Sequence, residues 1–441
     1  MNEYPDSVKE KLTSIIRKMS KSPSLFVKNP KTDFTRSRKL PFGTIMKVLI
    51  CMGGNSVCKE LLESQNYDLH TATASAFIQQ RDKLLPSAFE FLFREFTSTM
   101  DNPQYYKGYR LFAADGSDLH TATNPNDADT YHQINSDIKG YNLLNLNVLY
   151  DLCSKLYVDA NVQAHRNANE HKALTTMIGR YADTERVVLI ADRGYEGYNN
   201  FAHIEQKGWN YLIRVKDLGR NGILSGLSLC SQLPPDGEFD VRIQQTLTRK
   251  QTNEVKAHPE IYHVIPTNST FDFLDLRINK FYPISFRVVR FKITEDSYET
   301  VITNLNESEF PPYELKELYS KRWGVETSFR ELKYSVGLVN FHAKKREHII
   351  QEIFARLTMY NFSTMITSHV IIRQHDTRYT YQVNFTAAIH ICRYFLRLCP
   401  HAPPPDVEAV IRKNVLPVRP GRADKRKIRY KTPVSFIYRV T

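Results

Sequence analysis

The chain has 441 residues, of which 41% are hydrophobic and 12% are aromatic. This composition excludes a wholly disordered protein, and the length favours two to four domains over one small core. With 60 Lys and Arg against 47 Asp and Glu, the formal net charge is +13. A positive charge of this size favours a polyanionic partner, most often nucleic acid.

Cysteine spacing and hydropathy indicate the compartment. The six cysteines are widely scattered and include no C-x-x-C pair, so we expect neither a zinc site nor a disulfide framework. The N-terminal stretch MNEYPDSVKEKLTS lacks the apolar core of a secretion signal. Because the sequence has no run of about eighteen apolar residues, we expect no membrane span and a location in the reducing cytoplasm.

The first hundred residues have helical patterns and a basic character. Apolar spacing predicts amphipathic helices over residues 8–22 and 44–52, and residues 71–96 predict a short helix, a turn at Pro86 and another helix. Two interpretations of this region stay open. It is either a helical bundle with a solvated basic face or a helix-turn-helix-like DNA reader, with these side chains near phosphates: Arg36, Arg38, Lys39, Arg81 and Lys83.

From about residue 108 the pattern changes to strands. Three closely spaced strands, YRLFAADGS, YNLLNLNVLYDL and KLYVDANVQAH, predict an antiparallel meander. A helix over 168–184, the apolar strand VVLIAD, a helix over 198–208 and the strand WNYLIRVKD follow. This order predicts a mixed α/β sheet with VVLIA buried at its centre.

The second half of the chain returns from strands to helices. Residues 218–307 contain further strand patterns in FDVRIQQTLT, IYHVIP, ISFRVVRFKIT and YETVITNL. After PPYELKELYS the pattern is helical to about residue 372. The tail has a Pro-rich HAPPPD and then VRPGRADKRKIRYK, which is either a DNA-tracking arm or a plain solvated charge run.

Two aspartates follow apolar strands and precede expected turns: Asp115 in LFAADGS and Asp192 in VLIADRGY. Each taken alone is an ordinary turn former. Both, however, stand at the polar ends of strands predicted to be central, where the two carboxylates would meet and need a cation. Because no His/Cys set competes, we expect the hard, oxygen-ligated ions Mg²⁺ or Mn²⁺.

The stretch LYSKRWGVETSFRELK, residues 318–333, predicts one amphipathic helix with a polar face beside an apolar stripe. Two interpretations stay open: a salt-bridged surface helix, or a helix that supplies a third carboxylate among phosphate-binding groups. Glu331 lies off the polar face and is assigned to ordinary surface charge. The polar face spans about 80° of the helical wheel and contains Tyr319, Arg322, Glu326, Arg330 and Lys333.

These residues resemble a known family. The spacing Tyr319-x2-Arg322-x3-Glu326-x6-Lys333 is similar to the Y-(2)-R-(3)-E-(6)-K signature of the IS-four family of bacterial insertion-sequence transposases. Asp115 and Asp192 match the two aspartate segments of that family's DDE triad. The resemblance spans roughly residues 108–345, and the basic close of the chain also resembles the tail of these proteins.

The resemblance implies an α/β protein with a ribonuclease-H-like mixed-sheet catalytic core and a β-rich insertion before the Glu326 helix. The expected regions are a helical, basic N-terminal DNA-binding region (1–107), the first part of the core (108–217), the β-rich insertion (218–307), the second part of the core (308–375), and a C-terminal helical region with a basic tail (376–441).

The resemblance also implies a mechanism. Asp115, Asp192 and Glu326 would hold two Mg²⁺ or Mn²⁺ ions across the scissile phosphate, for hydrolysis at transposon ends and then strand transfer. The expected partners are terminal inverted repeats and target DNA, bound by a homodimer in the bacterial cytoplasm at the nucleoid. The expected DNA contacts are Tyr319, Arg322, Arg330, Lys333 and Arg193. Trp323 or Trp209 would stack on a base flipped out beside a hairpin intermediate, or would only pack in the fold.

Three rival functions remain: a related metal-dependent nuclease or resolvase, a non-catalytic transposase-derived DNA-binding protein, and a glycosidase. The presence of all three acids disfavours the second, and the Arg and Lys positions around Glu326 disfavour the third. Neighbouring polar residues receive structural roles. Asp118 and His120 are assigned to a loop, and His165, Glu170 and His171 to a strand-to-helix connection with Asn167 or Asn169 as helix N-cap rather than to metal binding.

Overall fold

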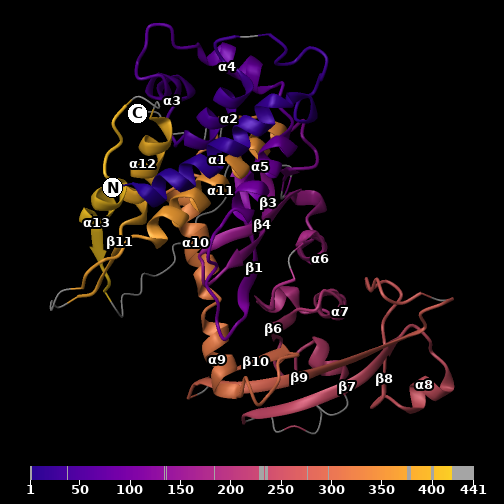
Figure 1. The fold of residues 1–441 in the computed structure, drawn as a ribbon. Coiled ribbons are helices and arrows are strands. Elements are labelled where there is room, and N and C mark those ends of the chain that lie inside the picture. The colour runs from indigo at the N-terminus through magenta and orange to yellow at the C-terminus, as the bar shows by residue number, and fades with distance from the viewer. Residues whose placement is uncertain are drawn as a thin grey trace.

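The computed structural model describes residues 2–419 except 37, 134, 136, 183, 228–232, 234–236, 276, 296, 375–378 and 399–401. Helices from both ends of the chain pack together at one end of the molecule, and a long sheet occupies the other (Figure 1). Nearly all of the basic segment predicted at 418–431 lies outside the described residues, as do Cys230 and Cys399. The described cysteines Cys51, Cys58, Cys153 and Cys392 are free thiols.

The N-terminal region is helical, as predicted. Pro86 is the first residue of its helix, where its missing N–H leaves no hydrogen bond unmade. An additional helix, α3, was not expected from the apolar spacing. The helices are α1 (Glu3–Lys21), α2 (Phe42–Cys51), α3 (Val57–Ser64), α4 (Ala74–Arg81) and α5 (Pro86–Ser98).

Helix α11 (Arg346–Ser368) is the centre of the helical end. It is buried along almost its whole length and packs against α5, α2 and the C-terminal helix α12 (Phe385–Arg397). A short helix, α13 (Val407–Lys413), and a small antiparallel pair, β11 (Tyr381–Val383) with β12 (Val415–Pro417), complete this part. Among the described helices, none combines the length and the apolar character that crossing a bilayer requires.

Buried charged side chains join the N-terminal helices to helix α11 at the helical end of the molecule. The Glu352 carboxylate on α11 is 1% exposed and accepts hydrogen bonds from Arg81 Nη1 at 2.9 Å and from the His342 backbone N–H at 3.0 Å. Arg356 Nη2 lies 3.4 Å from the same carboxylate. The helix-turn-helix interpretation placed Arg81 near phosphates, and for this residue it is wrong because the guanidinium is 2% exposed and paired in the core.

The sheet is mixed and continuous, which confirms the α/β class. Its strand order is β2-β3-β1-β5-β6-β10-β9-β7-β8, with β4 paired to β3. The antiparallel meander of β1, β3 and β4 is confirmed, and β5 runs parallel to both β1 and β6. The strands are β1 (Arg110–Thr121), β2 (Tyr131–His132), β3 (Tyr141–Asp151), β4 (Leu156–Ala164), β5 (Val187–Ala191), β6 (Asn210–Val215), β7 (Phe239–Thr248), β8 (Tyr262–Val264), β9 (Phe281–Thr294) and β10 (Ser297–Thr303).

Helices cover both faces of the sheet. Helices α6 (Glu170–Arg180) and α7 (Tyr198–Gln206) pack on the face that carries Phe112 and Ala114 of β1. Helices α10 (Trp323–Tyr334) and α11 pack on the opposite face, against Ala113 and its neighbours. All five residues of β5 are buried, as the apolar run predicted. Val187, Leu189 and Ala191 face α6 and α7, while Val188 and Ile190 pack in a separate cluster with residues of the helix Pro312–Ser320.

The strands of residues 218–307 extend the same sheet, because β10 pairs with β6 and then with β9. The chain continues into α9 (Pro312–Ser320) and α10. The single helix predicted over 318–333 is therefore wrong. Backbone N–H groups of Lys321, Arg322 and Val325 bond to the carbonyl three residues earlier, and this tight turn separates the two helices. The apolar stripe predicted beside the polar face is nevertheless buried: Leu318, Val325, Phe329, Leu332 and Val336.

Replacing Glu352 by Gln should destabilise the protein by about 3–5 kcal/mol, because the buried Arg81 and Arg356 guanidinium groups would lose their counter-charge. The midpoint of urea unfolding measures this loss. Glu347→Gln on the same helix is the matched control. Its side chain is 45% exposed in a pair with Lys28, so the expected loss is about 1 kcal/mol or less. Equal midpoints for the two variants would contradict a structural role for the buried charges.

Candidate active site

The parallel register of β1 and β5 brings two carboxylates to one edge. The last paired residues are Ala114 and Ala191, so Asp115 and Asp192 are the next residues on neighbouring strands. The turn that LFAADGS predicted after Asp115 is absent. Instead β1 continues to Thr121, where it is paired with β3 alone. Because β5 has ended there, Asp115 stands beside an open edge at the carboxyl end of the parallel pair, the usual position of ligand sites in such sheets.

Local backbone bonds orient both carboxylates. Asp115 Oδ1 accepts a hydrogen bond from the Gly116 backbone N–H at 2.8 Å. Asp192 Oδ1 accepts one from the Gly194 N–H, also at 2.8 Å, and so caps the 3₁₀ turn η3 (Arg193–Tyr195). Each carboxylate keeps oxygen lone pairs for a further partner.

The third carboxylate, Glu326, comes from the first turn of α10. Its Oε1 accepts a hydrogen bond from Arg322 Nη2 at 2.9 Å. The Arg322 side chain is 6% exposed and that of Glu326 is 45% exposed. Arg322 therefore supports Glu326 from inside the protein instead of lying on the outer surface as a free phosphate contact.

Electrostatics show that the three carboxylates share one environment. The pKa of Asp115 is raised to about 6, chiefly because burial penalises its charged form; the Gly116 hydrogen bond and Arg322 lower it, while Asp192 and Glu326 raise it further. Each acid thus makes ionisation of Asp115 harder. Repulsion of this kind is what a bound cation relieves.

The donor set fits a hard divalent cation, because carboxylate oxygens are the ligands that Mg²⁺ and Mn²⁺ prefer. Among the described residues, however, no three His, Cys, Asp or Glu side chains are already arranged to hold an ion. The three acids are within electrostatic reach of one another without forming a closed cage.

Three further cationic side chains belong to the elements that carry the acids: Lys333 and Arg330 to α10, and Arg193 to the turn after Asp192. Lys333 Nζ donates to Ser117 Oγ at 2.5 Å and lies 3.4 Å from the Asp118 carbonyl oxygen, which ties α10 to β1 two residues beyond Asp115. Arg330 and Arg193 are exposed. Asp118 belongs to β1, so its assignment to a loop is wrong; its carboxylate accepts a hydrogen bond from Asn145 Nδ2 at 3.3 Å.

Tyr319 and Glu331 lie elsewhere than expected, whereas Trp209 takes the packing role that was one of its two alternatives. Tyr319 is 3% exposed and its hydroxyl is buried, which does not fit the phosphate contact expected of it. Trp209 is 3% exposed and packs against Phe112, with ring centroids 5.6 Å apart. Glu331 is not plain surface charge, because its Oε2 accepts a hydrogen bond from the Tyr360 hydroxyl at 3.1 Å. The remaining tryptophan, Trp323, is 58% exposed.

Sequence reasoning missed two residues at the site. Glu170 opens α6, and Asn147 lies on β3 opposite Gly116. Asn169 is the helix N-cap, one of the two positions expected, and its side chain accepts a hydrogen bond from the Lys172 N–H at 2.9 Å. Only the register of β3 and the path of α6 bring Glu170 and Asn147 to the aspartates, and neither can be derived from local patterns.

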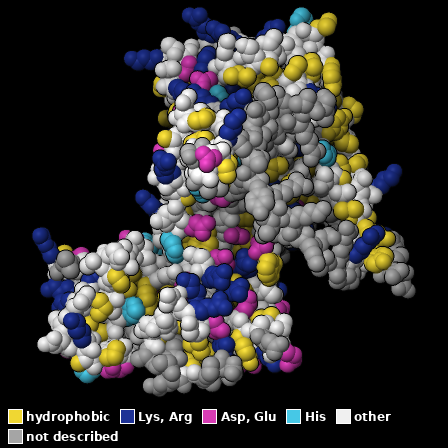
Figure 2. Space-filling view, turned by 180° about the vertical axis from the view of Figure 1, so that it is seen from behind, with side chains coloured by type: hydrophobic (Ala, Val, Ile, Leu, Met, Phe, Trp, Pro, Cys, Tyr) yellow, Lys and Arg dark blue, Asp and Glu magenta, His cyan; other side chains and the backbone are white. Residues whose placement is uncertain are grey.

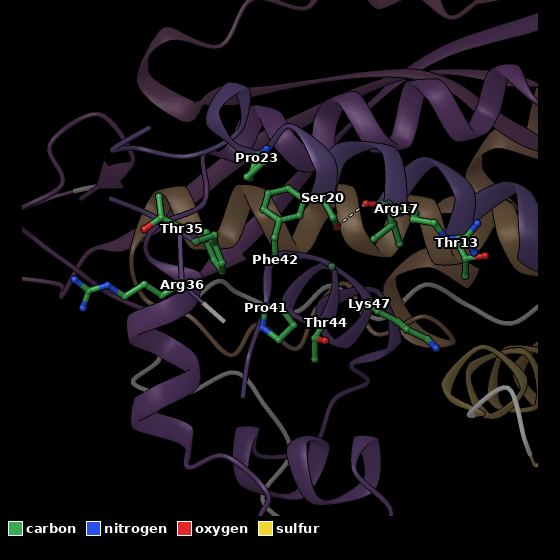
Figure 3. Close-up of a pocket in the computed structure, with 13 residues that line it drawn as sticks. Thr13, Arg17, Ser20, Pro23, Thr35, Arg36, Pro41, Phe42, Thr44 and Lys47 are labelled. Atoms are coloured by element: carbon green, nitrogen blue, oxygen red, sulfur yellow. Dashed lines mark hydrogen bonds between the residues drawn. The ribbon is translucent and has the colours of Figure 1, made fainter. Parts of the chain in front are cut away.

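A second polar feature lies in the N-terminal region. A cavity of about 510 Å³ opens between α1 and α2, with Arg17 and Lys47 among its lining residues (Figure 3). Arg36 lines the same cavity, and its side chain extends away from α2. Arg36, Arg38 and Lys39 are exposed, which fits both the DNA-reading and the solvated-face interpretation of this region.

A family model described as a transposase DDE domain matches residues 106–362 of this chain, more than half of its 441 residues. Among solved structures, the chain is similar to one titled as a cryo-EM structure of a piggyBac transposase synaptic complex with hairpin DNA. That match has a TM-score of 0.46 and 10% sequence identity, and it covers 95% of this chain and 87% of that chain. No curated protein is detectably similar in sequence.

Replacing Asp115 by Asn should stabilise the metal-free protein at neutral pH. The pKa of about 6 means that the Asp115 charge is disfavoured in the folded state, and removing it should recover about 1–3 kcal/mol. Thermal melting in a chelator measures the gain. A melting temperature equal to or below that of the wild type would contradict the burial penalty on the charge of Asp115.

Proposed function

The chain belongs to the transposase DDE domain family, and on this basis we propose that it cuts and rejoins DNA at the ends of an insertion sequence in a metal-dependent, cut-and-paste reaction. The observation that supports the proposal is the electrostatic coupling of Asp115 on β1 to Asp192, which follows β5, and to Glu326 on α10, whose carboxylate the buried Arg322 guanidinium holds. All three acids lie within the residues that match the family model.

In this proposal Asp115, Asp192 and Glu326 hold two Mg²⁺ or Mn²⁺ ions, which when bound activate the attacking hydroxyl and stabilise the leaving oxygen. Arg322 fixes the direction of the Glu326 carboxylate through their hydrogen bond. The Lys333 ammonium group is held beside β1 by its hydrogen bond to Ser117. There it would donate a hydrogen bond to a phosphate oxygen of the substrate.

DNA is the proposed partner. Arg330 and Arg193 are exposed near the acids and serve as phosphate contacts, while the exposed Trp323 ring is available for stacking on a base. In Figure 2, Lys and Arg side chains gather beside Asp and Glu side chains on the lower half of the molecule. The exposed Arg36, Arg38 and Lys39 make the N-terminal region a second DNA-binding surface.

The finer expectations belong to the same proposal. The order β4-β3-β1-β5-β6, with three antiparallel strands followed by two parallel ones, supports a ribonuclease-H-like core. We assign the chain to the IS-four group by its signature, and we propose a homodimer that pairs terminal inverted repeats at the bacterial nucleoid.

The test uses a plasmid that carries the DNA flanking the coding region. The wild type should cut it with Mg²⁺ or Mn²⁺ and transfer the freed end to a second DNA. Asp115→Asn, Asp192→Asn and Glu326→Gln should each reduce cleavage by roughly a thousandfold or more, because members of a catalytic set act together. DNA binding by gel shift should remain.

Glu95→Gln removes an exposed acid from α5 and should cut like the wild type. Full cleavage by any of the three active-site variants would disprove the assignment. Cleavage without strand transfer would identify a nuclease or resolvase, and wild-type binding without any nicking would identify a DNA-binding protein.

Arg322 and Arg330 should behave differently although both were expected to bind phosphates. Arg330→Ala should lower the salt slope of DNA affinity by about one, because an exposed cation releases a counterion on binding. Arg322→Ala should leave that slope unchanged and slow cleavage roughly ten- to hundredfold, through loss of the charge-assisted bond to Glu326. A reduced salt slope for Arg322→Ala would show that Arg322 is itself a phosphate contact.

A further inference from the structure

Glu170 lies between the two aspartate segments of the site. A Cβ built on Gly116, next to Asp115, would lie 2.8 Å from Glu170 Oε1. A Cβ built on Gly194, in the turn after Asp192, would lie 3.6 Å from Glu170 Oε2 and 3.0 Å from Asp192 Oδ1. The Glu170 carboxylate thus lies beside both glycines, where a side chain on either Gly116 or Gly194 would approach it.

The Glu170 carboxylate lacks a compensating positive charge. Burial raises its pKa, and the Asp192 and Asp118 carboxylates raise it further. Within the described part of the chain, no hydrogen bond or ion pair to this carboxylate is present. Its place in the first turn of α6 gives it only the weak attraction of the helix dipole, about 0.3–1 kcal/mol.

Asn147 provides a second, independent observation. Its side chain is fully buried on β3, and its Nδ2 donates to Asn145 Oδ1 at 2.6 Å. Its Oδ1 has no hydrogen-bond partner and lies 3.0 Å from the same Cβ position on Gly116 that Glu170 Oε1 approaches. A buried carbonyl without a partner costs about 1–3 kcal/mol, so native structures rarely leave one unused.

The two oxygens need the same kind of partner. An amide oxygen and an ionised carboxylate are both hydrogen-bond acceptors, so they do not satisfy each other. Asp192 Oδ1, on the other side of Glu170, is a third acceptor. Carboxylate and amide oxygens gathered around a space kept free of side chains are the donor set of a hard divalent cation.

We propose that Glu170 is a fourth carboxylate of the site and, with Asp192 and the Asn147 amide oxygen, binds a divalent cation there. This inference rests on the proposed function, since Asp192 belongs to both. In this inference, ligands lie on both faces of the sheet. Glu170 and Asn147 lie on the face covered by α6, and Glu326 lies on the face covered by α10. The helix N-terminus that had been given only a structural role thereby becomes part of the site.

The experiment measures Mn²⁺ binding to the full chain without DNA, by the loss of the electron paramagnetic resonance signal of free Mn²⁺. Glu170→Gln keeps the shape of the side chain and should weaken binding at one site at least tenfold. Gly116→Ala keeps every acid, but its methyl group would meet Glu170 Oε1 and Asn147 Oδ1, so it should weaken the same site. Glu95→Gln, exposed on α5, should bind like the wild type.

A purely structural role for Glu170 gives a different result. Glu170→Gln would then melt at a lower temperature yet bind Mn²⁺ with wild-type affinity and stoichiometry, and this outcome would overturn the inference. The inference would also be overturned if the two single variants, Gly116→Ala and Glu170→Gln, both bound Mn²⁺ like the wild type. A bound water between Glu170 and Asn147 predicts the same unchanged affinities.

The failure of this inference is separable from failure of the proposed function. If Asp192→Asn loses Mn²⁺ and cleavage while Glu170→Gln keeps both, the function stands and the role of Glu170 is refuted. If Asp115→Asn and Asp192→Asn both bind Mn²⁺ and cut DNA like the wild type, the function itself fails.

Discussion

The register between two parallel strands is the constraint on which the site depends. Ala114 of β1 pairs with Ala191 of β5, and the acids that follow them are therefore neighbours whatever the rest of the chain does. Because β5 stops there and β1 continues, Asp115 stands at an open edge of β1. Glu326 with Arg322 occupies one side and Glu170 the other. A slip of one residue between these strands would separate the aspartates and turn one of them to the opposite face.

The helical end of the molecule holds α10 against this edge. Val325 and Leu332 of α10 are fully buried in the same core as α11, and α11 is fixed to the N-terminal helices by the charges around Glu352. The two kinds of buried charge have opposite effects on stability. Glu352 is compensated by guanidinium groups, so its charged form is favoured and its pKa is lowered. Burial, to which two nearby acids add, penalises the charge of Asp115, so the fold carries a local cost at the position proposed for catalysis.

Elements with strong periodicity were predictable from the sequence, and so was the meeting of Asp115 with Asp192, because both follow apolar strands. The break between α9 and α10 was not predictable, since Lys321 and Arg322 both keep helical backbone angles and only the hydrogen-bond pattern changes. Tyr319, in the last turn of α9, is buried in the core. Arg81 was misplaced because its partner Glu352 lies 271 residues away. Glu170 was missed for a similar reason: a helix-opening acid has an adequate local explanation until the fold brings it to Gly116 and Gly194.

The central claim is that Asp115, Asp192 and Glu326 surround one metal-binding site. Fe²⁺ with ascorbate and peroxide, used in place of Mg²⁺, generates hydroxyl radicals that cut the polypeptide close to the bound ion, and mass spectrometry locates the cuts. We predict cuts in the middle of β1, in the turn after Asp192 and at the start of α10, all suppressed by excess Mg²⁺. Cuts confined to other parts of the chain, or cuts at these positions that persist in Asp192→Asn, would contradict the account.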